Sequence, residues 1–520
     1  MEMYRALLRK AFIGLMAILL LGLWGTVGFA QDESVLKIGL SAPVTSLDPH
    51  NYRSGIDSML CDQLFDTLVS RDLEMDTIPR LAKSWEKLSP TVWRFHLRQD
   101  VTFHDGTRFN AEAVKINLER LIDVDKPPRA GFYVAALAAV EVVDEYTVDL
   151  ITKVPTPPFL YNLGMMVIAM ISPAALEEYG DEVTLHPVGT GPFRFIEWVP
   201  GTRLVLAKNE AYFLGAPKLD KVVFNPIPED VARVMALLSG DVDVIQFPPV
   251  EYIQTLTDNP KYEVLSEDGM RVVGIWFNVK RYPFTDILVR KALNHAVDKN
   301  VIVDELLAGA ATKASGVLPP GVWGALSYDP YPYDPQKATE FLRQAGWTDS
   351  DGDGIVDKDG EPFKVTLATC MGKYYKDTEI ATVVQAQLRQ IGVDVRVEVW
   401  EWGAYLSHLK AREQQFHIQG WGAAPDVDVP LRANFYSGQP WNVMDYSSPQ
   451  VDALMDKGLQ TMNSEERMGY YHEAQRIIVD DAVWIVLYNE PKLYTTQNYV
   501  KDLGIHPEDR LLLLNTYMGK

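Results

Sequence analysis

The sequence predicts an α/β protein built from more than one folding unit. Strand-like and helix-like segments alternate along nearly the whole chain, which is the pattern of sheets covered by helices. The 520 residues exceed the size at which a single hydrophobic core stops growing, about 250–300 residues. Joints rich in proline and glycine interrupt the pattern at 154–159, 186–193 and 316–324. We therefore expect several packed units within one chain.

The strands are predicted from short apolar runs with many β-branched residues. In chain order they are 34–40, 93–98, 147–152, 203–208, 221–227, 272–279, 363–369 and 393–400. Branched side chains favour strands because they pack well on a pleated surface. One further strand, 487–496, is expected near the C-terminus.

The helices are predicted from apolar residues at helical spacing. In chain order they are 110–122, 229–239, 286–307, 335–345, 377–391 and 463–480. In the first of these, Val114, Leu118 and Leu121 share one face, and Asn110 is placed to cap the N-terminus. Alternating strands and helices of these lengths are typical of α/β folds.

The first thirty residues have the pattern of a cleavable export signal. Arg5, Arg9 and Lys10 precede an apolar run, 11–23, and small residues lead to a cleavage-like position at Ala30. A helix of that run is shorter than the roughly 20 residues that span a bilayer, so an uncleaved membrane anchor is the alternative that we favour less. No cysteine lies near the cleavage-like position, so we expect no N-terminal lipid anchor on cysteine. We expect a periplasmic or secreted protein.

Charge and cysteine content exclude several classes. The formal net charge of −21 would repel nucleic acid, so we expect no nucleic-acid partner. Only Cys61 and Cys370 are present, which excludes a disulfide scaffold and a cysteine-rich metal site. We expect these two cysteines to be unpaired or separately buried thiols.

The sequence carries no recognisable catalytic motif. It has no G-x-S-x-G elbow, H-E-x-x-H helix or phosphate-binding glycine loop, and its nine histidines are scattered. His104 and Asp105 could form an acid–base pair, but the H-D-G sequence is more typical of a tight turn. We therefore predict that the protein is not an enzyme and requires no cofactor. A secreted hydrolase is the alternative from another class.

One acidic segment resembles a calcium-binding loop. Asp349, Asp351 and Asp353 stand at alternate positions, and Ca²⁺ prefers six to eight oxygen ligands on such a turn. Ile355 would contribute its carbonyl and Asp357 a carboxylate, but the position of the usual bidentate glutamate holds glycine. The alternative is a solvated acidic turn. We predict a structural Ca²⁺ site if the segment binds an ion.

Aromatic residues gather in one C-terminal region. Its members are Trp400, Trp402, Tyr405, Trp421, Phe435, Tyr436 and Trp441. Tryptophan and tyrosine offer flat apolar faces with a polar edge, which suits a ligand cleft, and core packing is the alternative for any one of them. The neighbouring glycine- and aspartate-rich segment, 420–430, favours a binding surface.

The most distinctive motifs of the chain are the segment 81–107, LAKSWEKLSPTVWRFHLRQDVTFHDGT, and SLDPH at 46–50. They resemble the signature and the N-terminal motif of family-5 extracytoplasmic solute-binding proteins, the oligopeptide- and dipeptide-binding class that serves ABC importers. VGTGPFRF at 188–195, LLSGDVDVI at 237–245 and PFTDILVRKALNHAVDKNVIV at 283–303 follow in the family's order. GWGAAPDVD at 420–428 stands where the family has a cleft-lining Gly-Trp segment. The resemblance covers essentially the whole chain after the signal.

The resemblance implies a hinged two-lobe fold of the class II-like periplasmic-binding type, closing on its ligand. Lobe I would comprise 31–69, 186–272 and 485–520, with an extra subdomain inserted at 70–185, and lobe II would be 273–484. Ligand shifts the open–closed equilibrium because only the closed form gives it contacts to both lobes. An ABC transporter permease would be the partner, and we expect a monomer.

The same resemblance identifies candidate ligand-binding residues in lobe II. They are Glu401, Trp402, Trp421, Gly422, Ala424, Asp426 and Asp428. Peptide-binding members usually carry, at the position of Ala424, an aspartate that pairs with the ligand's ammonium group. A buried ammonium without a carboxylate is costly, so either Asp426 takes over that role or the ligand lacks the group. We predict a peptide-class ligand, with an oligosaccharide stacked on the tryptophans as the alternative.

Overall fold

A computed structural model describes residues 33–52, 54–122, 128–422 and 424–519. The predicted signal peptide, 1–30, lies outside these residues. Among the helices of the described ranges, none combines the length and the apolarity that a bilayer crossing requires.

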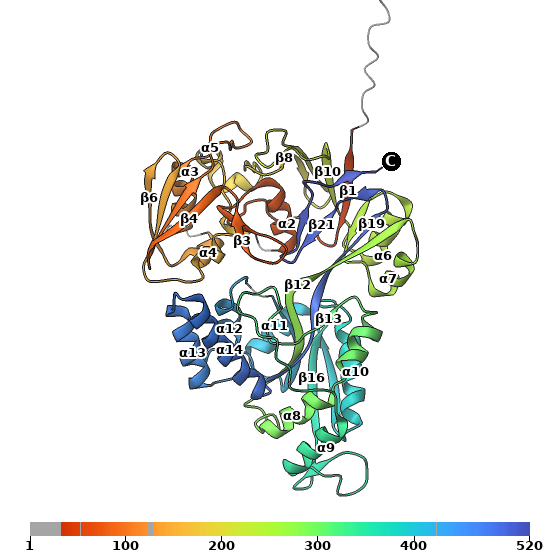
Figure 1. The fold of residues 1–520 in the computed structure, drawn as a ribbon. Helices are drawn as coiled ribbons and strands as arrows, with labels where there is room; N and C mark the ends of the chain where they lie inside the picture. The colour runs from red at the N-terminus through yellow and green to blue at the C-terminus, as the bar shows by residue number, and fades with distance from the viewer. Residues whose placement is uncertain (1–32, 53, 123–127, 423, 520) are drawn as a thin grey trace, which may run out of the picture.

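One large mixed sheet runs through the molecule and joins its two halves (Figure 1). Its strand order is β17-β16-β18-β12-β19-β11-β1-β10-β9-β8, with the short β13 (Thr312–Lys313) pairing on β19. We call the half built on the following strands the first lobe: β1 (Val35–Leu40), β8 (Phe193–Val199), β9 (Arg203–Lys208), β10 (Lys221–Pro226) and β11 (Val244–Gln246). The second lobe is the half built on β16 (Lys364–Cys370), β17 (Asp394–Trp400) and β18 (Phe416–Gly422).

Two long antiparallel strands belong to both halves. β12 (Tyr262–Phe277) and β19 (Trp484–Gln497) pair along almost their whole length, and one end of the pair lies in each lobe. Their register shifts between Asp268 and Val272, so the ladder is interrupted at the junction of the lobes. A bulged ladder bends more easily than a regular one, and we call this point the hinge.

The prediction of a strand at 272–279 found only the second half of β12. The first half, YEVLSEDGMR, carries four charged residues and a glycine, which hide the strand pattern. The other predicted strands are confirmed within a few residues, including the returning strand at 487–496, which is part of β19.

Helices cover both faces of each lobe. In the first lobe they are α2 (Gly55–Leu64), α6 (Asp230–Ser239) and α7 (Val250–Thr257). In the second lobe they are α8 (Ile287–Ala296), α9 (Pro335–Gln344), α10 (Asp377–Arg389), α11 (Trp402–Lys410), α12 (Asp428–Phe435), α13 (Pro449–Gln460) and α14 (Ser464–Asp480). Small two-stranded pairs complete the fold: β2 (Val69–Arg71) with β3 (Thr77–Pro79), β14 (Asp357–Lys358) with β15 (Glu361–Pro362), β20 (Val500–Lys501) with β23 (Tyr517–Met518), and β21 (Gly504–His506) with β22 (Arg510–Leu512).

The predicted helix 286–307 is two helices rather than one. Asp286 caps α8 by accepting a hydrogen bond from the Leu288 N–H, and Val297 turns the chain into an extended conformation. Asp298 then accepts the N–H of Asn300 and starts a separate π-helical turn, Val301–Leu306. Aspartate competes for backbone donors in this way, and it divides a continuous apolar pattern into two helices.

A separate antiparallel sheet stands beside the first lobe and lies within the predicted insertion. Its order is β4-β5-β7-β6, formed by β4 (Ala82–Ser89), β5 (Val92–Leu97), β6 (Leu137–Asp144) and β7 (Thr147–Thr152). It packs with α3 (Ala111–Leu121) and α4 (Phe159–Asn162) around its own hydrophobic core, and α5 (Pro173–Tyr179) packs through Leu176 against the core of the first lobe. The Asn110 cap of α3 is confirmed, since its side chain accepts the Ala113 N–H at 3.0 Å. We call this unit the inserted subdomain; the exact domain boundaries given above stay predictions.

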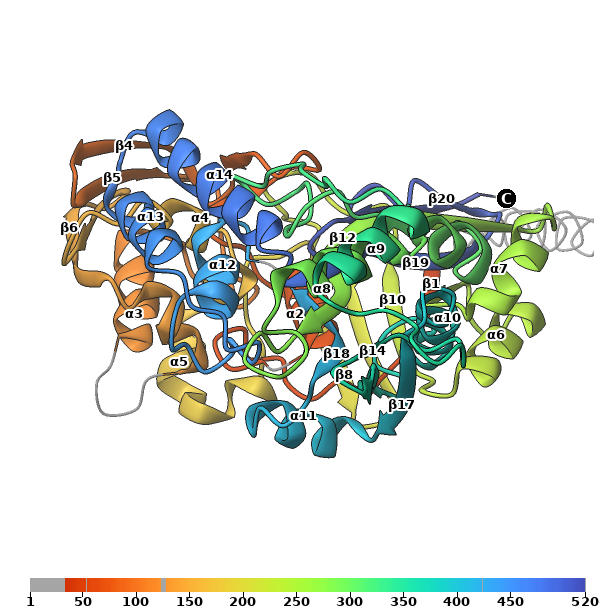
Figure 2. The same cartoon turned by 90° about the horizontal axis from the view of Figure 1, so that it is seen from below.

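The two views place this subdomain over the helices of the second lobe. In both, the sheet β4–β7 lies on the same side as α12–α14, whereas α6 and α7 lie on the same side as α10 (Figures 1 and 2). Cys61 and Cys370 are unpaired and buried in different hydrophobic cores, which confirms two separate thiols. The lobes are therefore joined by the hinge strands and by non-covalent contacts.

Candidate ligand-binding site

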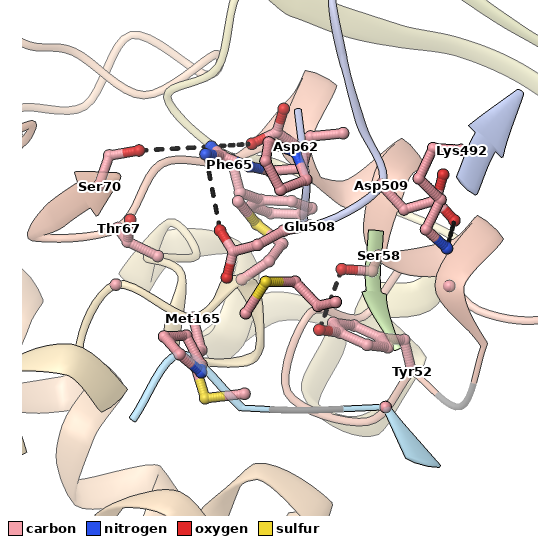
Figure 3. Close-up of a pocket in the computed structure, with 18 of the residues that line it drawn as sticks. Tyr52, Ser58, Asp62, Phe65, Thr67, Ser70, Met165, Lys492, Glu508 and Asp509 are labelled. Atoms are coloured by element: carbon pink, nitrogen blue, oxygen red, sulfur yellow. Dashed lines mark hydrogen bonds and ion pairs between the residues drawn. The ribbon is translucent and has the colours of Figure 1, made fainter. Parts of the chain in front are cut away.

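A cavity of about 240 Å³ lies where the two lobes and the hinge meet. Most of its lining comes from the first lobe and the inserted subdomain, and the hinge and the second lobe close the other side (Figure 3). The lining residues are Tyr52, Gly55, Ser58, Asp62, Phe65, Asp66, Thr67, Ser70, Arg80, Gly164, Met165, Met166, Met270, Arg271, Gly422, Pro425, Lys492, Pro507, Glu508, Asp509 and Arg510. A site between lobes is where a hinged protein can enclose a ligand.

The centre of the first-lobe wall is a network of charged side chains. Glu508 pairs with Arg71 and lies 3.6 Å from Arg510 Nη2. Arg510 Nη1 donates to Asp62 Oδ1 and to Ser70 Oγ, each at 3.3 Å. Figure 3 shows Glu508 between these groups and Met165. The network holds two cations and two carboxyl groups beside the cavity.

The two carboxyl groups of this network have opposite pKa shifts. Burial alone would raise the pKa of Glu508, but the Arg71 and Arg510 guanidiniums outweigh it and hold that pKa below its usual range. Burial raises the pKa of Asp62, and Arg510 offsets only part of that effect. Glu508 is therefore the carboxylate that keeps its charge most firmly.

Further charges of the lining are paired in the same way. Asp66 accepts hydrogen bonds from Arg80 Nε at 2.6 Å and from the Tyr212 hydroxyl at 3.0 Å. Lys492 Nζ donates to Asp509 at 3.1 Å. The lining thus alternates cations and anions, and a ligand carrying both kinds of charge finds partners for each.

The hinge contributes Arg271 to the other side of the cavity. Arg271 pairs with Glu490, so this ion pair joins β12 to β19 at the interrupted part of the ladder. Its side chain crosses Gly420 and Gly422 of β18: a Cβ on Gly420 would lie 2.9 Å from Arg271 Cδ. Glycine at these positions leaves the space that the guanidinium needs.

Lys373 is a cation of the second lobe that lies near Arg271, although it is not among the residues that line the cavity. Its ammonium lies 4.9 Å above the Trp402 ring, and no carboxylate among the described residues lies within 4.0 Å of it. Partial desolvation lowers the pKa of Lys373, and the nearby Arg271 guanidinium lowers it further. An unpaired ammonium in a cleft is a ready partner for a ligand carboxylate.

Trp402 and Glu401 hold adjoining positions with different roles. Trp402 is half-buried, with Tyr374 edge-on at 6.5 Å between ring centroids. Glu401 caps α11 by accepting the N–H groups of Gly403 at 2.8 Å and Ala404 at 3.2 Å. Trp402 therefore lies beside Lys373, whereas Glu401 serves as the N-cap of α11.

Trp421, Gly422 and Ala424 lie along the end of β18. Gly422 lines the cavity, and Ala424 is half-buried just beyond it, while Ala423 lies outside the described residues. Trp421 packs against Trp441, with 5.7 Å between ring centroids, and belongs to the edge of a hydrophobic core. Of these three, only Gly422 is part of the cavity lining.

Asp426 and Asp428 are buried inside the second lobe. Both oxygens of Asp426 accept from Arg467, at 2.6 and 2.7 Å, and Asp426 Oδ1 also accepts the Asp428 N–H. Asp428 accepts from the Tyr471 hydroxyl at 2.6 Å and pairs with Arg432. This geometry does not favour the hypothesis that Asp426 anchors a ligand ammonium, because its carboxylate is already fully engaged away from the cavity.

The acidic loop brings its first three aspartates together. Oxygen atoms of Asp349, Asp351 and Asp353 all lie within 4.8 Å of one another, as a calcium loop requires. Each also accepts a backbone N–H of the turn. Asp357 instead accepts the N–H and hydroxyl of Ser350, and the Ile355 side chain is buried. Calcium binding stays a prediction, with three carboxylates placed for it.

Sequence reasoning did not find the charged lining. The signal nearest to it is the C-terminal segment GIHPEDRLLLL, where Glu508, Asp509 and Arg510 interrupt a run of otherwise apolar residues. Consecutive charges in such a context are typical of a buried polar network. Their partners, Asp62 and Arg71, are more than 430 residues away along the chain, so no local pattern connects them.

Comparison with known proteins identifies the family. The model of the bacterial extracellular solute-binding proteins, family 5 (middle), matches residues 76–443. The glutathione-binding protein GsiB of Pectobacterium atrosepticum is 31% identical over 474 residues, which cover 89% of each chain. The structure of the periplasmic binding protein DppA of Helicobacter pylori, in complex with the peptide STSA, is 29% identical, with a TM-score of 0.73 over 94% of this chain and 98% of that one.

A more distant structure supports the fold alone. NikA from Brucella suis, in complex with Fe(III)-EDTA, is 23% identical and has a TM-score of 0.84, covering 94% of this chain and all of that one. Together with the family match, these likenesses confirm the two-lobe α/β fold expected from the sequence. The chain belongs to family 5 of the bacterial extracellular solute-binding proteins, the substrate-binding components of ABC transporters.

Proposed function

We propose that this protein captures a short peptide between its lobes, outside the cytoplasm, and delivers it to the permease of an ABC importer. The observation that carries the proposal is the charged lining of the cavity, in which cations and anions alternate. A peptide presents an ammonium group and a carboxylate at its two ends, and it needs partners of both signs when it leaves water. The GsiB and DppA relatives, described as glutathione- and peptide-binding, support the same ligand class.

The size of the cavity supports a ligand of a few residues. Its volume of about 240 Å³ lies below the roughly 300 to 1,000 Å³ that is typical of small-molecule sites, which favours a short ligand over a long one. In our proposal Lys373, just outside the cavity lining and near Arg271, receives the ligand carboxylate, since no carboxylate of the described residues lies within 4.0 Å of its ammonium. Asp62 and Glu508 are the acidic groups that face the ligand ammonium, in place of the aspartate that Ala424 replaces.

The lining gives less support to an oligosaccharide. Sugars are commonly held between flat aromatic faces, whereas the aromatic residues of the described lining are Tyr52 and Phe65. Trp402 and Trp421 lie outside this lining. A secreted hydrolase is also less supported, because the relatives are named as binding proteins.

The first experiment compares ligand classes directly. The protein is unfolded and refolded to remove bound ligand, and its melting temperature is then measured with glutathione, with tripeptides and with neutral oligosaccharides. We expect a rise only with the peptide-class compounds, because binding to the folded state stabilises it by mass action. A rise with oligosaccharides alone would contradict the proposal.

A second experiment tests the role of Lys373. We expect Lys373→Met to weaken binding of a tripeptide about tenfold or more, as for the loss of a charge-assisted hydrogen bond of roughly 1.5–3 kcal/mol. An amidated tripeptide, which lacks the carboxylate, should bind wild type and variant equally well. The matched control is Lys364→Met at the exposed first residue of β16. It should change the affinity neither for the tripeptide nor for its amidated form. Equal tripeptide affinities for Lys373→Met and wild type, by calorimetry, would remove Lys373 from the site.

A further inference from the structure

Outside the hinge, an aromatic pair connects the inserted subdomain to the second lobe. Tyr161 belongs to α4, and Trp323 lies in the proline- and glycine-rich segment 316–324. Their ring centroids are 5.9 Å apart and their planes are tilted by 35°. Aromatic rings attract one another at this separation. The two residues stand 162 positions apart in the sequence.

The second lobe holds Trp323 rigidly from behind. The Trp323 N–H donates to the Pro425 carbonyl at 2.8 Å, and the Trp323 carbonyl accepts the Val427 N–H at 3.1 Å. The Arg467 guanidinium lies 4.5 Å from the centre of the indole ring, on the face that it can bind by cation–π attraction. Arg467 is itself fixed by the bidentate pair with Asp426. The buried aspartate therefore supports a fixed indole that faces the inserted subdomain.

The first lobe holds Tyr161 through a side chain of the cavity network. Arg71 donates to the Tyr161 carbonyl at 2.9 Å and to the Gly164 carbonyl at 3.0 Å, and it also pairs with Glu508. Burial, together with the nearby Asp426 carboxylate, raises the pKa of Tyr161 to about 12. The phenol is therefore neutral and its ring is available for packing. Both partners are fixed before they meet.

The pair lies beside the cavity and away from the hinge strands. Gly164, which follows α4, and Pro425, which binds the Trp323 backbone, both line the cavity. In both views α4 lies on the side of the molecule opposite α6, α7 and α10, with β12 between them (Figures 1 and 2). When two bodies rotate about a hinge, contacts far from the axis separate first and farthest. A contact at this place is therefore lost when the lobes open, and it stabilises the closed form by its own interaction free energy.

We propose that Tyr161 and Trp323 form a latch that stabilises the closed arrangement of the lobes without touching the ligand. The latch favours closure in the ligand-free protein, so it sets how much of the protein is already competent to hold a ligand. Tyr161 and Trp323 are positioning residues in this proposal, since they act through the lobes. The proposal concerns the open–closed equilibrium and is independent of whether the ligand is a peptide.

The test measures the distance between the lobes in refolded, ligand-free protein. Spin labels are attached to Glu86→Cys in β4 and Glu465→Cys in α14, two exposed positions on facing parts of the molecule. Cys61 and Cys370 are fully buried and should stay unlabelled in the folded protein. Pulsed electron–electron double resonance then gives the populations of short and long distances.

We expect Tyr161→Ala to raise the ratio of open to closed protein roughly three- to tenfold, which is the range for loss of one aromatic pair. Tyr161→Phe keeps the ring and should give the wild-type distribution. Phe132→Ala, which removes an exposed ring of the same subdomain, is the matched control and should also leave it unchanged.

Three outcomes would overturn the latch. They are an unchanged distance distribution in Tyr161→Ala, an equal shift in Tyr161→Phe, and an equal shift in Phe132→Ala. Because Trp323 is packed into the second lobe, Trp323→Ala is a supporting variant only, and its denaturation curve is measured beside the distances. Since no ligand is added, failure of the peptide proposal would leave this result untouched.

Discussion

Four histidines of the described residues stay neutral in the folded protein. Burial lowers the pKa values of His50, His104, His417 and His506 to about 4. The unfolded chain, with a histidine pKa near 6.5, therefore takes up protons between pH 6.5 and pH 4 that the folded protein does not. By proton linkage, stability is full above about pH 6.5 and is lost as the pH falls toward 4.

We predict a lower free energy of unfolding at pH 5 than at pH 7, by about 2 kcal/mol for each of these histidines. Urea denaturation at the two pH values measures it. His417→Gln removes one titrating group, so it should reduce the difference between the two pH values by about 2 kcal/mol, whatever it does to stability at pH 7. A variant with the same pH difference as wild type would contradict this account.

Asp426 is the residue at which sequence and structure diverge most. Its place in GWGAAPDVD indicated a ligand contact, but no local pattern predicts that Arg467, 41 residues later, reaches it. The glycine-tryptophan motif correctly marked the segment that borders the cavity. Which of its side chains point inward depends on packing between α12 and α14, and packing cannot be read from one segment alone.

We therefore predict that Asp426→Ala lowers stability rather than removing a ligand charge. Leaving Arg467 buried without its partner should cost about 3–5 kcal/mol of unfolding free energy. The matched control is Glu197→Ala, which breaks the exposed Arg203–Glu197 pair and should cost no more than about 1 kcal/mol. If urea denaturation shows that Asp426→Ala is as stable as the wild-type protein, Asp426 again becomes a candidate ligand-binding residue.

At the scale of elements, the sequence predicts best where a pattern is local. β7 and β9 are found at their true bounds, and α6, α9 and α14 within one or two residues, because each buries one apolar face. The short second-lobe helices α11, α12 and α13 were not predicted. They owe their helicity to caps and to packing against neighbours: Glu401 caps α11 and Ser448 caps α13.

The acidic loop before β14 is predicted to bind Ca²⁺, and this can be tested directly. We expect chelator-treated protein to bind one Ca²⁺ with measurable heat and a raised melting temperature. Asp353→Asn should weaken this binding at least tenfold, since it removes one of three converging carboxylates. Asp359→Asn, in the same hairpin but outside the cluster, is the control. Absence of heat at millimolar Ca²⁺ would leave the loop as a solvated turn.

For the whole molecule, the two-lobe fold was predicted through the resemblance to a known family. The hinge strands β12 and β19 show how the two lobes are joined. Gly269 lies in the interrupted part of β12, where an added Cβ would come within 2.6 Å of the Glu490 carbonyl and 2.9 Å of Lys492 Cε. Glycine thus allows β12 and β19 to approach each other closely beside the cavity. The sequence signal for this position was one glycine among charged residues, which also concealed the strand.

We predict that Gly269→Ala separates the hinge strands and lowers stability by more than 1 kcal/mol, since backbone must move to admit the methyl group. Gly469→Ala on α14 is the matched control: its methyl group meets nothing within 4 Å, and the change should be neutral or stabilising by up to about 1 kcal/mol. Denaturation gives the stabilities, and small-angle scattering gives the lobe separation. A Gly269→Ala protein indistinguishable from wild type in both would show that the close approach is not needed.

The shared strands also fix the order in which the molecule can be completed during synthesis. β11 pairs with β19, so residues near 245 cannot form this part of the sheet until residues near 495 have been synthesised. In the same way, the Gln63 side chain donates a hydrogen bond to the carbonyl of Leu511. The second lobe, by contrast, lies between the two hinge strands and has nearly all its partners earlier. During synthesis from the N-terminus, the first lobe therefore cannot complete its sheet until almost the last residue has been added. Contacts between residues so far apart in sequence give a high contact order, which is typical of slow folding.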